Sequence, residues 1–156
     1  MNFLEDIQKK PLIADGAMGT LIYEKGYFIN TSYEHLSVSQ PALIEELHRA
    51  YVDAGAAVIL TNTFGANRIK LEAHGLADQI EAINTAGVAL ARQAAGSSTY
   101  VLGSVGPILQ SEQLYSDHHS EELEAHFNEQ MGYLAAAGID AFQLETFTHA
   151  QEALLA

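Results

Sequence analysis

Four short, largely apolar runs punctuate the chain, and each is followed at once by polar residues or glycine. The runs are Leu12–Ala14, Ala57–Leu60, Tyr100–Leu102 and Ala141–Leu144. Near-continuous hydrophobicity over a few residues is typical of parallel strands that are buried on both faces. Because segments with helical spacing separate these runs, the sequence predicts an α/β fold built on a parallel sheet.

Three long helices are predicted between these strands. The first begins at Pro41, since proline is favoured in a first turn, and Asp78 with Glu81 matches a capping box for the second. Ser120 is the expected N-cap of the third. The first helix has these apolar residues on one face: Leu43, Ile44, Leu47, Tyr51 and Ala54. The three helices are expected to end at Gly55, Gly96 and Gly138.

Shorter helical segments and one irregular stretch complete the pattern. Short helices are expected at Phe3–Lys10, Leu21–Lys25 and Asn67–His74, and from Thr148 onward. The stretch from Tyr27 to Val38 has no clean period, so we expect an ordered loop near the mouth of the sheet.

Polar side chains follow every predicted strand, and they are Asp15, then Asn62 and Thr63, then Ser104, and finally Glu145. Because the carboxyl ends of parallel strands meet at one edge, we expect these groups to form one site for a small polar ligand. Thr63 and Ser104 are explained equally well as turn or cap residues. Glu145 directly follows an apolar strand, where a carboxylate is costly unless it meets a cation or a donor. Gly16 and Gly19 would let backbone N–H groups approach the ligand closely.

The charge of the chain excludes two classes of partner. It has 20 acidic and 7 basic residues, for a net charge of −13, and no Lys or Arg follows Arg92. Neither nucleic acid nor an anionic membrane surface is therefore an expected partner. The acidic N-terminus differs from a signal peptide, and no apolar run approaches the ~20 residues that span a bilayer. A cytoplasmic location is expected.

The chain has no cysteine, which excludes disulfides, a thiolate nucleophile and a Cys-ligated metal within it. His118, His119 and His126 lack the spacing of a metal site. The remaining scattered histidines are expected at the surface or in loops, and they are His35, His48, His74 and His149.

Four motifs together resemble the homocysteine S-methyltransferase family. They are DGAMGT at 15–20, TNTFGAN at 61–67, GSVGP at 103–107 and ETF at 145–147, in this order over nearly the whole chain. The pattern is most similar to the homocysteine-binding module of folate-dependent enzymes, in particular the bifunctional homocysteine S-methyltransferase/methylenetetrahydrofolate reductase type. The resemblance implies methyl transfer to the homocysteine thiolate, giving methionine. The implied methyl donor is methyltetrahydrofolate or a similar molecule.

The resemblance also implies a fold and a role for each site residue. The family fold is a (β/α)8 TIM barrel about twice as long as this chain. Residues 1–156 are therefore expected to be a single partial domain, the N-terminal (β/α)4 half of such a barrel. Asp15 and Glu145 would bind the amino group of homocysteine, and the N–H groups of Gly16, Ala17 and Met18 would bind its carboxylate. Asn62, Thr63 and Ser104 complete the candidate substrate-binding set.

In the complete family enzyme a zinc ion held by three cysteines binds the homocysteine thiolate and keeps it deprotonated. Because this chain has no cysteine, no cofactor is expected in it alone, and alone it is expected to be inactive. The alternative is a non-catalytic half-barrel that binds a small ligand or self-associates. A barrel enzyme acting on a phosphorylated substrate is a weaker option, because the chain is acidic and lacks a Gly-rich phosphate cradle.

A half-barrel has two open edges, here Leu12–Ala14 and Ala141–Leu144. It also exposes inward-facing apolar side chains, which would be Ile13, Ile59, Val101 and Phe142 or their alternates along each strand. The sequence therefore predicts either self-association through the open edges, with twofold symmetry, or an unstable monomer.

Overall fold

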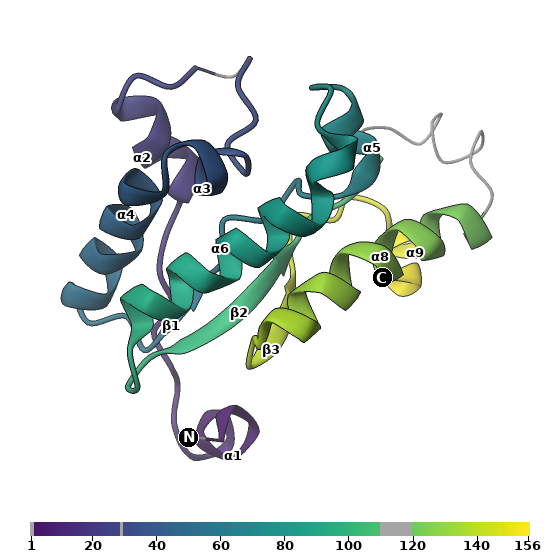
Figure 1. Ribbon diagram of the computed structural model, residues 1–156. Coiled ribbons are helices and arrows are strands. Elements are labelled where there is room, and N and C mark those ends of the chain that lie inside the picture. The colour runs from purple at the N-terminus through teal and green to yellow at the C-terminus, as the bar shows by residue number, and fades with distance from the viewer. Residues whose placement is uncertain (1, 29, 110–119) are drawn as a thin grey trace.

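A three-stranded parallel sheet lies at the centre of the computed structural model, which describes residues 2–28, 30–109 and 120–156. Its strands, in order across the sheet, are β1 (Val58–Leu60), β2 (Tyr100–Val105) and β3 (Ala141–Leu144). Helices separate them along the chain (Figure 1), so the predicted α/β class with a parallel sheet is confirmed. β3 has its predicted bounds. β2 continues beyond Leu102 because, as the central strand, it pairs with a neighbour on each side.

The predicted first strand, Leu12–Ala14, does not form a regular strand. It meets the sheet through one parallel bridge between Ala14 and Val58, next to which the Asp15 N–H donates to the Val58 carbonyl over 2.9 Å. Among the described residues this segment has strand neighbours on one side only, so nothing extends the ladder. The sheet thus consists of three strands and a bridged segment where four strands were expected.

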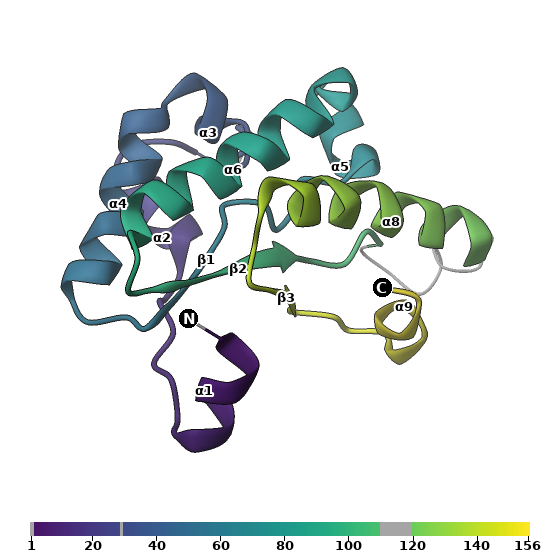
Figure 2. The ribbon, with the colours of Figure 1, turned by 60° about the horizontal axis from the view of Figure 1, so that its bottom comes forward.

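Three helices cover one face of the sheet, as Figure 2 shows: α4 (Pro41–Asp53), α6 (Ile80–Ala95) and α8 (Ser120–Ala137). Ile59 and Val101 point toward this layer and pack against small residues of α6. Val105, on the same face of β2, packs against α8 through Phe127 and Leu134. The long helices predicted from apolar spacing are therefore confirmed.

The starts of two helices differ from the predictions. The predicted capping box is wrong, because Asp78 lies inside a 3-10 turn, Ala77–Gln79, that runs directly into α6 without a side-chain cap. Ser120 is the first residue of α8 itself, so it is not the N-cap, and the preceding position lies outside the described residues.

The short helices are α2 (Met18–Glu24), α3 (Leu36–Ser39), α5 (Arg68–Glu72) and α9 (Ala150–Leu155). α2 begins at Met18, earlier than predicted, so the glycine turn after Asp15 leads straight into a helix. The stretch predicted as the loop Tyr27–Val38 contains the start of α3. None of the helices in the described ranges has the length and hydropathy needed to cross a bilayer.

His48 is the histidine for which the surface prediction is wrong. Its side chain on α4 is fully buried, and neither ring nitrogen has a hydrogen-bond partner among the described residues. Burial lowers the pKa of His48 to about 4, so the ring is neutral at pH 7. His118 and His119 lie outside the described residues.

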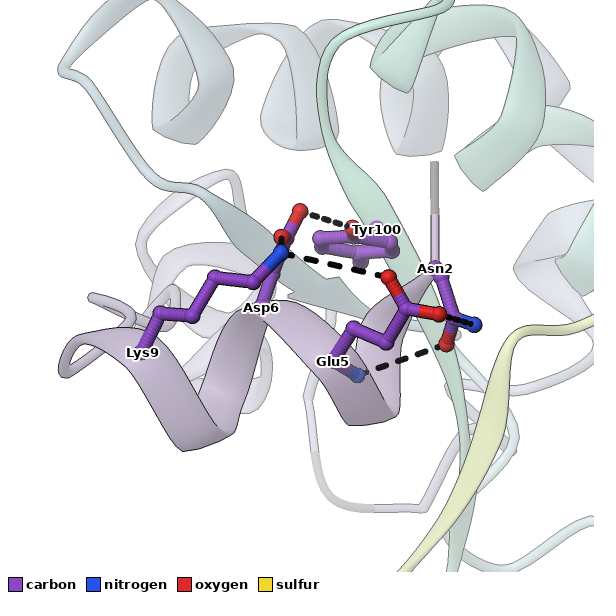
Figure 3. Close-up of polar contacts among 5 residues, drawn as sticks. All are labelled: Asn2, Glu5, Asp6, Lys9 and Tyr100. Atoms are coloured by element: carbon purple, nitrogen blue, oxygen red, sulfur yellow. Dashed lines mark hydrogen bonds and ion pairs between the residues drawn. The ribbon is translucent and has the colours of Figure 1, made fainter.

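The helix α1 (Phe3–Lys9) packs on the other face of the sheet, where Val58, Tyr100 and Leu102 form a cluster with Phe3. Figure 3 shows the polar side of this contact, in which the Tyr100 hydroxyl donates to Asp6 Oδ2 over 2.7 Å. This bond raises the pKa of Tyr100 to about 12 and lowers that of Asp6. One aromatic side chain thus fixes α1 beneath β2.

The edges of the sheet expose apolar side chains. In the register, Phe142 pairs with Gly103 and Leu144 with Val105, so both side chains lie on the helix face, where each is 38% exposed. Ile13, next to the bridging Ala14, is 72% exposed at the opposite edge. Side chains alternate between the two faces along each strand. The set expected on the inner face therefore lies on the helix side, and it comprises Ile13, Ile59, Val101 and Phe142.

Candidate functional site

A pocket of about 570 Å³ lies at the carboxyl ends of the strands. All eight of the residues predicted to form the site line it: Asp15, Gly16, Ala17, Met18, Asn62, Thr63, Ser104 and Glu145. They come from four separate stretches of sequence. The structure brings these stretches together because parallel strands direct their exits to the same edge of the sheet.

Asp15 is held at the pocket wall by the neighbouring strand. Its Oδ2 accepts the Leu60 N–H over 2.9 Å. Burial raises the pKa of Asp15 to about 6, and the negative charge of Glu145 contributes in the same direction. The carboxyl is therefore charged at neutral pH in a position that disfavours the charge, and a bound cation would relieve this.

Glu145 follows β3 directly, and its Oε1 accepts a short hydrogen bond from the Ser104 hydroxyl. Ser104 lies inside β2 rather than after it, with its side chain on the pocket side and only 2% exposed. Its serine hydroxyl therefore serves as a fixed donor to a carboxylate, which is neither the turn nor the cap role considered from the sequence.

Asn62 and Thr63 line the pocket while their polar groups bond to the protein. Asn62 Nδ2 donates to the Tyr33 carbonyl over 2.7 Å and to Ser37 Oγ over 3.1 Å. The Thr63 hydroxyl donates to the Ser104 carbonyl over 2.8 Å. Both residues therefore build the wall, and Asn62 ties Tyr33 and the start of α3 to the exit of β1.

Sequence reasoning missed several lining residues: Tyr33, Glu34, Thr61, Phe64 and Gln143. Glu34 accepts the Gly65 N–H over 2.8 Å and the Ser32 hydroxyl over 3.0 Å, so its carboxylate holds the loop against the 61–67 motif. The irregular polar composition of this loop was the only sequence signal, and it located the loop at the mouth without identifying the residue.

Two glycines shape the wall by allowing close approach. A Cβ on Gly106 would lie 2.3 Å from the Phe64 ring, and the Gly106 N–H donates to the Phe64 carbonyl over 3.0 Å. A Cβ on Gly16 would lie 3.0 Å from the Tyr51 hydroxyl oxygen. Both positions therefore favour glycine, because a Cβ at either would crowd a neighbouring aromatic side chain.

The lining of the pocket is anionic. It includes three carboxylates, Asp15, Glu34 and Glu145, and no Lys or Arg. Such a lining favours a ligand with an ammonium group. The described residues contain no group of three His, Cys, Asp or Glu placed to hold a metal, and the chain has no cysteine, so these residues do not fit the zinc site that the resemblance implies.

Comparison with known sequences matches the chain to one family and to two methionine synthases. The pattern of the family described as homocysteine S-methyltransferase matches residues 12–156. The methionine synthases of Mycobacterium leprae (strain TN) and Mycobacterium tuberculosis (strain ATCC 25618 / H37Rv) are 31% and 32% identical to the chain. Each match covers 93% of this chain and 13% of the relative, so the chain spans a small part of their length.

Solved structures of a homocysteine methyltransferase are also similar to this chain. The oxidised form of the homocysteine methyltransferase MmuM from Escherichia coli superposes with a TM-score of 0.83 at 30% identity, over 99% of this chain and 60% of that one. The metallated form superposes with a TM-score of 0.80 at 29% identity, over 96% of this chain and 58% of that one.

Proposed function

Because the chain belongs to the homocysteine S-methyltransferase family, we propose that its pocket binds the amino-acid end of homocysteine. Residues 1–156 would then form a partial domain, the N-terminal (β/α)4 half of a TIM barrel. In the complete site, homocysteine would accept a methyl group from methyltetrahydrofolate or a similar donor and become methionine.

The observation that carries the proposal is the pair of carboxylates at the exits of the bridged segment and of β3. Asp15 and Glu145 line one pocket, and the negative charge of Glu145 adds to the effect of burial in raising the pKa of Asp15. An ammonium group between them would satisfy both charges, and charge-assisted hydrogen bonds of this kind are among the strongest in proteins.

The N–H groups beside Asp15 support a site for the carboxylate of the same ligand. Those of Gly16 and Ala17 donate to no protein atom among the described residues, and both residues line the pocket with Met18. Backbone N–H groups left free in this way suit an anion. A zwitterion would therefore find complementary groups for both of its charges along one wall.

Replacing either carboxylate by its amide is expected to weaken homocysteine binding. Asp15→Asn and Glu145→Gln should each raise the Kd of L-homocysteine by about 10-fold to 100-fold, since a hydrogen bond to a charged group contributes about 1.5–3 kcal/mol. Titration calorimetry or ligand-observed NMR under reducing conditions measures this. Glu24→Gln, an exposed change at the end of α2, is the matched control. Unchanged affinity in both pocket variants would refute the proposal.

A second candidate, ligand binding without catalysis, is supported by the lack of thiolates in the chain. The purified chain is expected to form no methionine from homocysteine and methyltetrahydrofolate, even with added zinc, because nothing in it provides thiolate ligands. An assay for methionine checks this, together with elemental analysis after mild chelation. Turnover, or zinc retained one to one, would contradict the second candidate.

A further inference from the structure

Three hydrogen bonds form a closed ring at the ends of β1 and β2. The Ser104 N–H donates to Thr61 Oγ1 over 3.0 Å, and the Thr63 hydroxyl donates to the Ser104 carbonyl over 2.8 Å. The two threonine oxygens are 2.6 Å apart. Because the single proton of Thr63 goes to Ser104, the bond between the threonines must be donated by Thr61. The direction of every bond in the ring is thereby fixed.

The three residues of this hydrogen-bonded ring are almost completely buried. Thr61 is 4% exposed, Thr63 is not exposed and Ser104 is 2% exposed. In such surroundings hydrogen bonds strengthen one another, and a missing member leaves its partners unsatisfied at a cost. Before the ring, the Thr61 N–H donates to the Leu102 carbonyl, and beyond it the Gly106 N–H donates to the Phe64 carbonyl. The ring therefore links the ends of β1 and β2 between these two backbone bonds.

The ring holds both backbone polar groups of Ser104, and the Ser104 hydroxyl donates its proton to Glu145. A connected path thus runs from Thr61 through Ser104 to a carboxylate of the pocket. We propose that Thr61 is a positioning residue for the ligand's ammonium group, because its hydroxyl fixes Ser104 and thereby Glu145. This inference rests on the proposed function, since it takes Glu145 as the group that meets the ammonium.

Two ligands separate this role from a general structural one. L-homocysteine carries the ammonium group, whereas 4-mercaptobutanoate has the same chain without it. Thr61→Val, which keeps the shape and removes the hydroxyl, should raise the Kd of homocysteine about fivefold and leave that of 4-mercaptobutanoate within about twofold, as expected for one hydrogen bond of about 1 kcal/mol. Thr61→Ser keeps the hydroxyl and should restore affinity for homocysteine.

Further variants make each outcome decisive. Thr63→Val breaks the ring at another bond and should show the same selective loss, so the test stands even if Thr61→Val does not fold. Thr148→Val removes an exposed hydroxyl outside the pocket and should change neither affinity. Equal weakening of both ligands, or no effect of either ring variant, would overturn the inference. If Glu145→Gln itself leaves homocysteine affinity unchanged, it is the proposed function that fails.

Discussion

Acidification is expected to destabilise the chain by up to about 3 kcal/mol through one side chain, His48. The ring is fully buried in α4, and its nitrogens have no partner among the described residues. Burial lowers its pKa from 6.5 to about 4. Between these two values the unfolded chain binds a proton that the folded chain does not. Stability therefore falls as the pH falls from about 6.5 to about 4.

Urea unfolding of wild type and His48→Leu tests this at pH 7.5 and pH 5.5, both above the isoelectric point of about 4.7. His48 should account for a loss of about 1 kcal/mol between these two pH values in wild type. His48→Leu should lack that part of the loss and should be at least as stable as wild type at pH 7.5, because it removes two unsatisfied buried polar atoms. His74→Leu, at an exposed position, should behave as wild type. Identical pH dependence in wild type and His48→Leu would contradict this account.

The second large effect concerns association, and the chain is expected to form a dimer through the two edges of its sheet. Ile13 is 72% exposed at one edge, and Phe142 and Leu144 are each 38% exposed at the other. Full burial of an exposed apolar side chain contributes about 1.5–3 kcal/mol, so Ile13 would gain most of this and the partly buried Phe142 and Leu144 a smaller part each. In a twofold arrangement, the edge that carries Ile13 would pair with β3 of the second copy, and β3 of the first copy would pair with the Ile13 edge of the second.

Ile13→Lys should abolish this association while leaving the monomer folded, because the side chain is already exposed in a single copy. Val38→Lys is the matched control, since Val38 is 40% exposed and belongs to α3 rather than to either edge of the sheet. Sedimentation equilibrium measures both variants beside wild type. A wild-type chain that remains a stable monomer at all concentrations would contradict the prediction.

The sequence was most informative where a single strand or its exit decides the position of a residue. Asp15 and Glu145 were found because any carboxylate at the end of a parallel strand reaches the same edge of the sheet. The position of Glu34 depends instead on the path of an irregular loop. Ser104 was placed after its strand because the glycines around it resemble a turn, yet strands on both sides hold β2 extended through it.

His48 illustrates a different limit of sequence reasoning. It follows Leu47 and stands four residues after Ile44, on the buried face of α4, so the helical spacing alone predicts that its side chain is buried. Its polarity led to the surface prediction, because spacing does not show that a neutral imidazole can be buried without partners. The prediction for Leu12–Ala14 fails for a different reason. The composition of this segment suits a strand, but it pairs with β1 alone and forms one bridge in place of a regular strand.

The contact between α1 and β2 has a consequence for the order in which the chain assembles. Asp6 and Tyr100 are 94 residues apart in sequence, and closing so large a loop costs more entropy than forming the nearby contacts between α6 and β2. A ribosome makes α1 well before it makes Tyr100. We therefore expect α1 to complete its contact with the sheet late in folding, after β1 and β2 have paired.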